Sequence, residues 1–171
     1  MLISITELNA VGVDAFADAL KPLFEAAKPL AEALYAQRPF TSYLELIDRA
    51  ESLSSSLPNS QRVEIVNAHP RIGANPTQLS ALSFKEQGYD RQSPDDNLQA
   101  TLAELNTQYE ERFGFRFVIF VNKRPRSEIV EILRERLKNS RDDELRTGLR
   151  AMFDIARDRL RGLTKNEGEE D

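Results

Sequence analysis

The sequence predicts an all-α protein, a single-domain helical bundle of about eight helices with one short extended segment near residues 115–121. Three observations support this fold class. Apolar residues recur at helical spacing through most of the chain, only 7 of the 171 residues are glycine, and 40% hydrophobic with 30% charged residues is typical of a globular domain. We expect one domain over residues 1–165 and an acidic disordered tail at 166–171.

The composition excludes several classes of function. The chain has no cysteine and a single histidine, so thiol nucleophiles, cysteine-based zinc sites and iron–sulfur clusters are excluded, and we expect no metal site. No apolar run is long enough to cross a bilayer, and the N-terminal residues lack the pattern of a signal peptide. The last residues are not a peroxisomal tripeptide. We therefore expect no membrane association and a cytoplasmic location.

Most of the expected helices have one apolar face. In four segments the apolar residues recur every three or four positions, as in helices that pack one side against a core. We expect the third of these helices to begin at Ser127, because serine is a favourable N-cap. The four faces contain, in order, Leu44, Ile47, Ala50, Leu53 and Leu57; Leu98, Leu102, Leu105, Tyr109 and Phe113; Ile129, Ile132, Leu133 and Leu137; and Leu145, Leu149, Met152, Phe153, Ala156, Leu160 and Leu163.

One segment departs from the helical pattern. Phe115 to Val121 is a run of β-branched and aromatic residues between Gly114 and Pro125, which predicts an extended conformation. The chain offers no second run of this kind as a pairing partner, so its backbone N–H and C=O groups must find other partners or stay available. Available backbone groups beside a pocket can bind a ligand.

The only histidine, His69, is the first candidate for acid–base chemistry. It follows a short helical stretch at 61–68 and precedes Pro70, which disfavours a helical conformation at the residue before it. We therefore place it at a corner between a helix and a loop. Imidazole is the side chain whose ordinary pKa lies near neutrality, so acid–base catalysis at pH 7 would fall to His69. The alternative is a surface or capping histidine.

Ser83 and Glu86 match the S-x-x-E pattern of a capping box. In this motif Ser83 would begin a helix and Glu86 would reach back to its backbone amide. The beginning of a helix also offers free N–H groups and a positive dipole end to an anion. The two residues could therefore cap the helix and bind a ligand together.

The last helix carries several arginines, and the periodicity of its apolar residues places them at different distances from the apolar face. Arg159 falls at the border of the apolar face, whereas Arg161 faces water. A guanidinium near the interior needs a carboxylate or carbonyl partner, so Arg159 is either half of a structural ion pair or a ligand for an anion. Basic residues from 123 to 161 alternate with acidic ones in a chain of net charge −5, which predicts a solvated surface and no nucleic-acid partner.

Six short segments follow one another over nearly the whole chain. They are Arg38-Pro39-Phe40; Ala68-His69-Pro70 with Gly73; Leu82-Ser83-x-x-Glu86-Gln87; Tyr109-x-x-Arg112-Phe113-Gly114-Phe115 leading into Phe117-Val118-Ile119; Ile129-x-x-x-Leu133-x-x-Arg136-Leu137; and Ile155-Ala156-x-x-Arg159-Leu160. In this order they resemble the OHCU decarboxylase family, where OHCU is 2-oxo-4-hydroxy-4-carboxy-5-ureidoimidazoline. No single segment is specific, but the ordered set is.

The resemblance implies an all-α homodimer that decarboxylates OHCU to (S)-allantoin without a cofactor, as the last step of urate breakdown. It implies catalytic roles for His69, Glu86 and Arg159, with a small-molecule ureidoimidazoline as the substrate. The further residues that it implies in substrate binding are Pro70, Ser83, Gln87, Val118 and Ile119.

Two other functions are compatible with the same residues. One is a non-catalytic helical interaction domain whose arginine-rich face docks an acidic partner. It predicts that His69, Ser83 and Arg159 lie far apart and share no cavity. The other is a related ureide-processing enzyme on the same scaffold.

Overall fold

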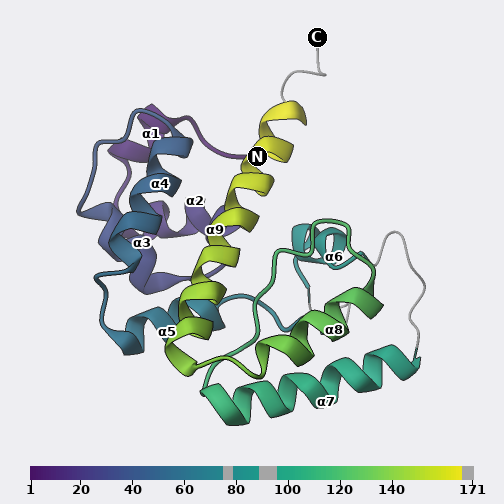
Figure 1. Cartoon of the computed structure of the whole chain (residues 1–171). Helices are drawn as coiled ribbons and strands as arrows, with labels where there is room; N and C mark the ends of the chain where they lie inside the picture. The colour runs from purple at the N-terminus through teal and green to yellow at the C-terminus, as the bar shows by residue number, and fades with distance from the viewer. Residues whose placement is uncertain (75–78, 89–95, 167–171) are drawn as a thin grey trace.

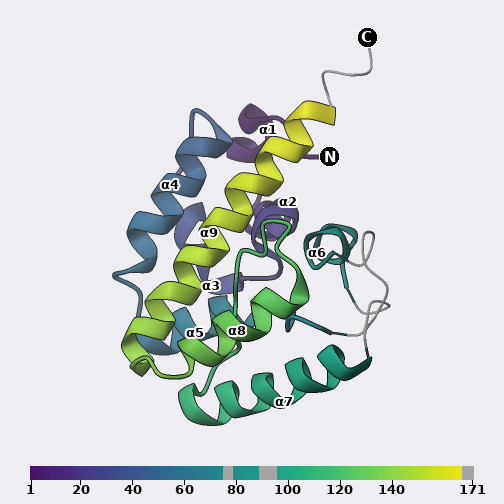
Figure 2. The same ribbon diagram turned by 45° about the vertical axis from the view of Figure 1, so that its right-hand side comes forward.

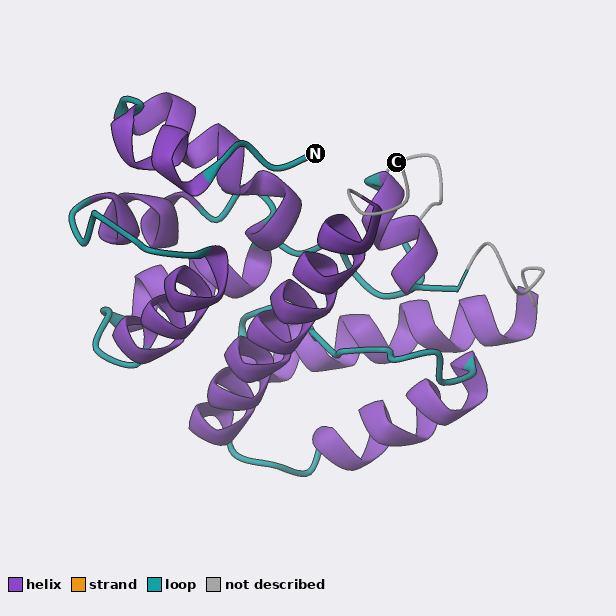
Figure 3. Cartoon of the chain, turned by 90° about the horizontal axis from the view of Figure 1, so that it is seen from above, coloured by secondary structure: helices purple, strands orange, loops and turns teal. Residues whose placement is uncertain are grey.

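The structure, a computed structural model, describes residues 1–74, 79–88 and 96–166, and this part of the chain is helical with no strand (Figures 1 and 3). The predicted all-α class is confirmed, with nine helices in the described ranges against about eight expected. The helices are α1 (Ile5–Ala10), α2 (Val13–Phe24), α3 (Lys28–Tyr35), α4 (Tyr43–Ser54), α5 (Asn59–Asn67), α6 (Ala81–Glu86), α7 (Asp96–Phe113), α8 (Arg126–Arg136) and α9 (Arg141–Asn166).

The longest helix, α9, is the central element of the fold. It has 26 residues, about 39 Å at 1.5 Å per residue, and it packs against α2, α4 and α5. In Figure 1, α1, α3 and α4 lie to the left of α9 and α2 passes behind it, whereas α6 and α8 lie to the right with α7 below. Its apolar face is buried as the periodicity predicted, with Met152, Phe153 and Ala156 at most 1% exposed. Polar side chains on this helix can therefore reach both halves of the molecule.

The apolar face of helix α4 differs from the prediction at both ends, because Leu44 is exposed and Leu57 lies beyond Ser54, the last residue of the helix. Ser42 caps its N-terminus by accepting a hydrogen bond from the Glu45 amide at 3.1 Å. Ile47 and Ala50 are buried as expected, but Leu44 is 53% exposed and Leu46 is buried in its place. The periodicity holds, but the centre of the buried face lies toward Leu46, and Leu44 at the first turn points away from the core.

The beginning of α8 also corrects the prediction. The helix starts at Arg126 after Pro125, and Ser127 lies inside its first turn. The Pro125 carbonyl accepts the amides of Glu128 and Ile129 at 3.0 and 3.2 Å. A proline, whose φ is fixed near the helical value, is therefore a sufficient boundary without a side-chain cap.

The segment at 115–121 runs without helix or strand, as expected for an extended piece that lacks a pairing partner. In Figures 1 and 2 the connection from α7 to α8 lies between α9 and α6. Arg116 ties it to the end of α5, since its amide binds Asn67 Oδ1 at 2.9 Å and its guanidinium binds the Asn67 carbonyl at 2.8 Å. The rings of Phe115 and Phe117 pack edge-on against Tyr109.

The predicted tail lies almost entirely outside the described residues. Asn166 ends α9, and 167–171 are not described, so disorder of the tail and the domain boundary at 165 stay predictions. Among the described helices, none is long and apolar enough to cross a membrane.

Candidate active site

His69 lies at the corner that the sequence predicted, where α5 ends and Pro70 prevents its continuation. Its amide still binds the Val66 carbonyl at 3.2 Å, and its own carbonyl accepts Arg116 Nη1 at 3.2 Å. The backbone of the corner is thus held from both sides. The side chain is 3% exposed, so the alternative of a surface histidine is wrong.

The imidazole of His69 is neutral at pH 7. Burial and the positive charge of Arg159 together lower its pKa to about 4, against the negative charge of Glu25, which acts in the opposite direction. Both ring nitrogens are buried, and neither has a hydrogen-bond partner among the described residues. Leaving such atoms without a partner costs about 1–3 kcal/mol, so an imidazole in this state is suited to a ligand that supplies the missing bonds.

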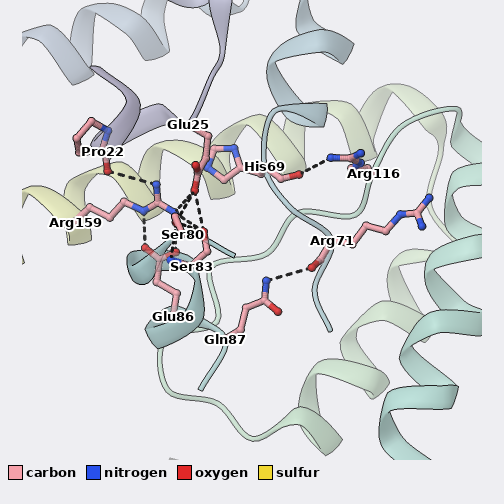
Figure 4. A network of polar contacts seen from close by, with 10 residues as sticks. All are labelled: Pro22, Glu25, His69, Arg71, Ser80, Ser83, Glu86, Gln87, Arg116 and Arg159. Atoms are coloured by element: carbon pink, nitrogen blue, oxygen red, sulfur yellow. Dashed lines mark hydrogen bonds and ion pairs between the residues drawn. The ribbon is translucent and has the colours of Figure 1, made fainter. Parts of the chain in front are cut away.

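Ser80, and not Ser83, caps helix α6. Its hydroxyl accepts the Ser83 amide at 3.1 Å, and the helix begins at Ala81. The predicted capping box at Ser83 and Glu86 is therefore wrong, because a serine three residues earlier takes the cap and places Ser83 inside the first turn. The consequence is that Ser83 and Glu86, three residues apart, lie on one face of α6. Both side chains reach Arg159 from that face (Figure 4).

Arg159 is the centre of a polar network that joins three parts of the chain (Figure 4). Its side chain is 2% exposed, and Glu86 binds it with both oxygens, at 2.6 Å to Nε and 2.8 Å to Nη2. Nη2 also contacts Glu25 Oε1 at 2.9 Å and Ser83 Oγ at 3.2 Å. Nη1 has one acceptor among the described residues, the Pro22 carbonyl at 3.4 Å. The expected carboxylate partner therefore exists, and part of the Nη1 donor capacity is left over.

Burial raises the pKa of the Glu86 carboxyl, although the hydrogen bonds and charge of Arg159 lower it. Glu86 forms no hydrogen bond with His69 in the described part of the chain, so it holds the arginine and does not orient the imidazole. Arg157, two residues earlier on α9, does not belong to this network. It pairs with Asp48 at 2.9 Å and with Glu51, both on α4 and away from this network.

A cavity of about 210 Å³ brings the predicted residues together. Small-molecule sites for drug-sized ligands measure roughly 300–1,000 Å³, so this cavity suits a smaller compound. All eight residues that the sequence pointed to line it: His69, Pro70, Ser83, Glu86, Gln87, Val118, Ile119 and Arg159. The interaction-domain alternative required these side chains to lie far apart, which is wrong for this fold.

Two of the lining residues have side chains that already form hydrogen bonds within the protein. Gln87 accepts the Gly73 amide at 2.9 Å and donates to the Arg71 carbonyl at 3.1 Å, so its amide holds the loop after His69 in place. Ser83 gives its one proton to Glu25 at 2.8 Å and accepts from Ser80 at 3.0 Å and from Arg159. Both shape the wall of the cavity through these bonds.

The extended segment contributes backbone groups to the same wall. The Val118 carbonyl accepts a hydrogen bond from Arg136 Nη1 at 2.9 Å. Arg136 in turn binds Glu144, which accepts the Tyr109 hydroxyl at 2.7 Å, and this buried network fixes the segment from behind. In the described structure the N–H groups of Val118 and Ile119 have no acceptor. They are the available backbone donors that the sequence predicted for this run.

Glu25 is the site residue that sequence reasoning missed. It lies at the end of α2, and its carboxylate contacts Arg159 and Ser83, which are 134 and 58 residues away in the chain. No motif surrounds it, and a glutamate after a helix is ordinarily solvent-exposed. Sequence reasoning also missed three residues that line the cavity itself, Lys85, Lys123 and Asp158. No group of His, Asp and Glu among the described residues is arranged to hold a metal ion.

Comparisons with known proteins agree on one family. A family model for OHCU decarboxylase matches residues 9–161. The 2-oxo-4-hydroxy-4-carboxy-5-ureidoimidazoline decarboxylase of Mus musculus is 32% identical over 93% of this chain and 92% of the mouse protein. That of Xenopus laevis is 29% identical over 95% of each chain. A uric acid degradation bifunctional protein of Bacillus sp. (strain TB-90) is 28% identical over 98% of this chain, which spans about a third (33%) of that protein.

Solved structures show the same fold. A crystal structure of OHCU decarboxylase in the presence of (S)-allantoin is 25% identical and superimposes with a TM-score of 0.65, over 84% of this chain and 94% of that one. A crystal structure of (S)-allantoin synthase superimposes with a TM-score of 0.67 at 20% identity, over 94% of this chain and 54% of that one.

Proposed function

The chain belongs to the OHCU decarboxylase family, and on that premise we propose that it decarboxylates OHCU to (S)-allantoin in urate degradation. The observation that carries the proposal is the state of His69, a neutral buried imidazole with two unpartnered nitrogens in the cavity that Arg159 also lines. This arrangement combines a base with groups that can bind a small polar anion. The family name supplies the reaction, and the geometry supports the residue roles.

The substrate carries the electron sink that the reaction needs. Carbon 4 bears the carboxylate and a hydroxyl, and a C=N bond adjoins it in the ring. When the bond to the carboxylate breaks, its electron pair forms a double bond between carbons 4 and 5 and displaces the C=N pair onto the ring nitrogen, which takes up a proton from water, and CO₂ leaves. One proton must then reach carbon 5 while the hydroxyl proton departs. The reaction therefore needs orientation and proton transfer, and the chain's own residues can supply both.

His69 is the residue placed to move the protons. As a neutral base it accepts the hydroxyl proton, and the resulting imidazolium is a donor for one face of carbon 5, which sets the S configuration. The pKa of the free imidazole is low because of burial and Arg159. A bound carboxylate is a further negative charge beside the ring, which raises that pKa and favours the proton transfer. General acid–base catalysis of this kind contributes about 10²–10⁴-fold.

Arg159 and Glu86 orient the ring of the substrate. The remaining Nη1 donor of Arg159 binds a substrate oxygen, and the Glu86 carboxylate can accept the N–H groups of the ureido arm. The free amides of Val118 and Ile119 are donors for a ring carbonyl. Contacts from three sides can hold the carboxylate out of the ring plane. In that position the breaking bond to the carboxylate overlaps with the C=N bond that receives its electrons. No cofactor takes part in these steps.

The test is the formation of (S)-allantoin by the purified chain and by His69→Asn. OHCU also decays spontaneously to racemic allantoin, so circular dichroism of the product must be followed and not total allantoin. We expect optically active product from the wild-type chain and only the racemic background from His69→Asn, with an unchanged far-UV spectrum. Wild-type turnover by the variant would remove His69 from the mechanism, and no turnover by the wild-type chain would favour a related ureide substrate.

We also propose the homodimer that the family resemblance implied and the cytoplasmic location that the sequence indicated. Size-exclusion chromatography with light scattering tests the first, because a chain of 19.4 kDa would elute with twice that mass. Cell fractionation in the source organism tests the second.

A further inference from the structure

We propose that Glu25, which follows α2, is a positioning residue of the site that sets the orientation of Arg159 and Ser83. The inference rests on the proposed decarboxylase function. Glu25 does not line the cavity itself, so it acts on the substrate through the groups it holds and through its charge. Apart from the Pro22 carbonyl, it is the only hydrogen-bond partner that the region of the first four helices gives Arg159 within the described residues.

The strained backbone conformation of Glu25 indicates that its side chain has a functional role. It follows α2 with φ 55° and ψ −156°, a conformation that is open to glycine and strained for other residues. Glycine at this position would end the helix with less strain. Residues held in such conformations cluster at functional sites, where the surroundings fix them. Here the carboxylate is fixed by contacts with two site residues.

A single oxygen of Glu25 makes those contacts. Oε1 accepts Arg159 Nη2 at 2.9 Å and the Ser83 hydroxyl at 2.8 Å, with Ser80 Oγ at 3.4 Å, and the side chain is 19% exposed. Glu86 binds the same guanidinium through Nε and Nη2 from α6. The guanidinium therefore lies between carboxylates from two different helices, which fixes its plane as well as its position (Figure 4).

Loss of the Glu25 carboxylate would release both neighbours. Arg159 would keep only Glu86 as a carboxylate partner, so the Nη1 donor that we assign to the substrate could swing out of place. The Ser83 hydroxyl would lose its acceptor, and its proton would be free to turn toward the cavity. A displacement of about 1 Å in a positioning group can cost about 100-fold in rate. The expected loss is therefore kinetic.

Glu25 also acts on His69 through its charge. Its carboxylate raises the pKa of the imidazole against the effects of burial and of Arg159. The other charged groups that contact His69 or the network, or line the cavity, are Arg159, Arg116, Glu86, Lys85, Lys123 and Asp158, and substitution of Glu25 removes none of them. The pKa of His69 is thus a readout of Glu25 that does not depend on turnover.

The experiment compares Glu25→Gln and Glu25→Gly with Glu32→Gln, an exposed glutamate of α3 outside the cavity, as the matched control. The measurements are kcat/KM for (S)-allantoin formation, the thermal unfolding midpoint, and the NMR titration of the single histidine. For both Glu25 variants we expect kcat/KM to fall by about 10- to 100-fold with a raised KM. We expect the His69 titration to move to lower pH, the unfolding midpoint of Glu25→Gly to equal or exceed that of Glu25→Gln, and no change in Glu32→Gln.

Two results would overturn the inference. One is a kcat/KM of Glu25→Gln within twofold of the wild-type value. The other is a loss of activity that follows a loss of stability in both variants, with an unshifted His69 titration or with failure to fold, because that pattern belongs to a structural glutamate. If the wild-type chain itself makes no (S)-allantoin, the proposed function fails, and the His69 titration still decides whether Glu25 acts on the imidazole.

Discussion

Acid should destabilise this protein through one identifiable group. Burial and Arg159 lower the pKa of His69 to about 4 from an ordinary value of about 6.5. The folded state therefore binds fewer protons than the unfolded state between these two pH values. The stability linked to His69 is fully present above pH 6.5 and is lost as pH falls toward 4.

The size of the effect follows from the two pKa values. At pH 5 about 97% of unfolded imidazole carries a proton, against about 9% in the folded protein, so the free energy of unfolding falls by about 2 kcal/mol between pH 7 and pH 5. Below pH 4 the loss approaches about 3 kcal/mol. Glu86 changes the free energy of unfolding in the opposite direction as pH falls, because burial raises its pKa. It is present in both the wild-type chain and the His69 variant, so its contribution cancels in the comparison.

Urea unfolding of the wild-type chain and of His69→Asn at several pH values between 5 and 7 isolates this contribution. The wild-type free energy of unfolding should fall with pH by about 2 kcal/mol more than that of the variant. Parallel curves for the two proteins would show that His69 is charged or solvated in the folded state, and the neutral base of the mechanism would then be wrong. Because the chain has one histidine, its NMR titration is a direct control.

Three further predictions concern other parts of the structure. Arg159→Lys should raise KM for OHCU, because one ammonium cannot reproduce the planar contacts with Glu86 and the substrate. Arg157→Lys, which changes a pair on the outer face, is its control, and equal steady-state kinetics for both variants would contradict the assignment. Ser80→Ala removes the cap of α6 and should cost about 1 kcal/mol in urea unfolding. It should also lower kcat/KM, and an unchanged free energy of unfolding would show that the cap is not needed. Tyr109→Phe removes one buried donor from the Glu144 carboxylate, which keeps Arg136 and Asn139, and should lower the free energy of unfolding by about 1–3 kcal/mol. Its kcat/KM should stay near the wild-type value, and a stable protein with reduced turnover would instead link the buried network to catalysis.

Much of this protein could be predicted from the sequence, since periodicity and residue type are local properties. Helical spacing predicted α4, α7, α8 and α9, and a run of β-branched and aromatic residues predicted the segment at 115–121. The residue before a proline predicted the corner at His69. The ordered resemblance pointed to eight residues, and all eight line one cavity. Their catalytic and binding roles stay predictions until the variants are measured.

The tertiary structure decided what depends on contacts between distant segments. The S-x-x-E pattern was compatible with a cap at Ser83, but Ser80 competes for the same helix end, and only the folded chain shows which serine wins. The charge state of His69 depends on its burial and on the charges of Arg159 and Glu25, which no local pattern records. Glu25 reaches Arg159 across 134 residues of chain, because α2 and α9 happen to pack side by side. A long-range ion pair leaves no spacing in the sequence, so its discovery required the fold.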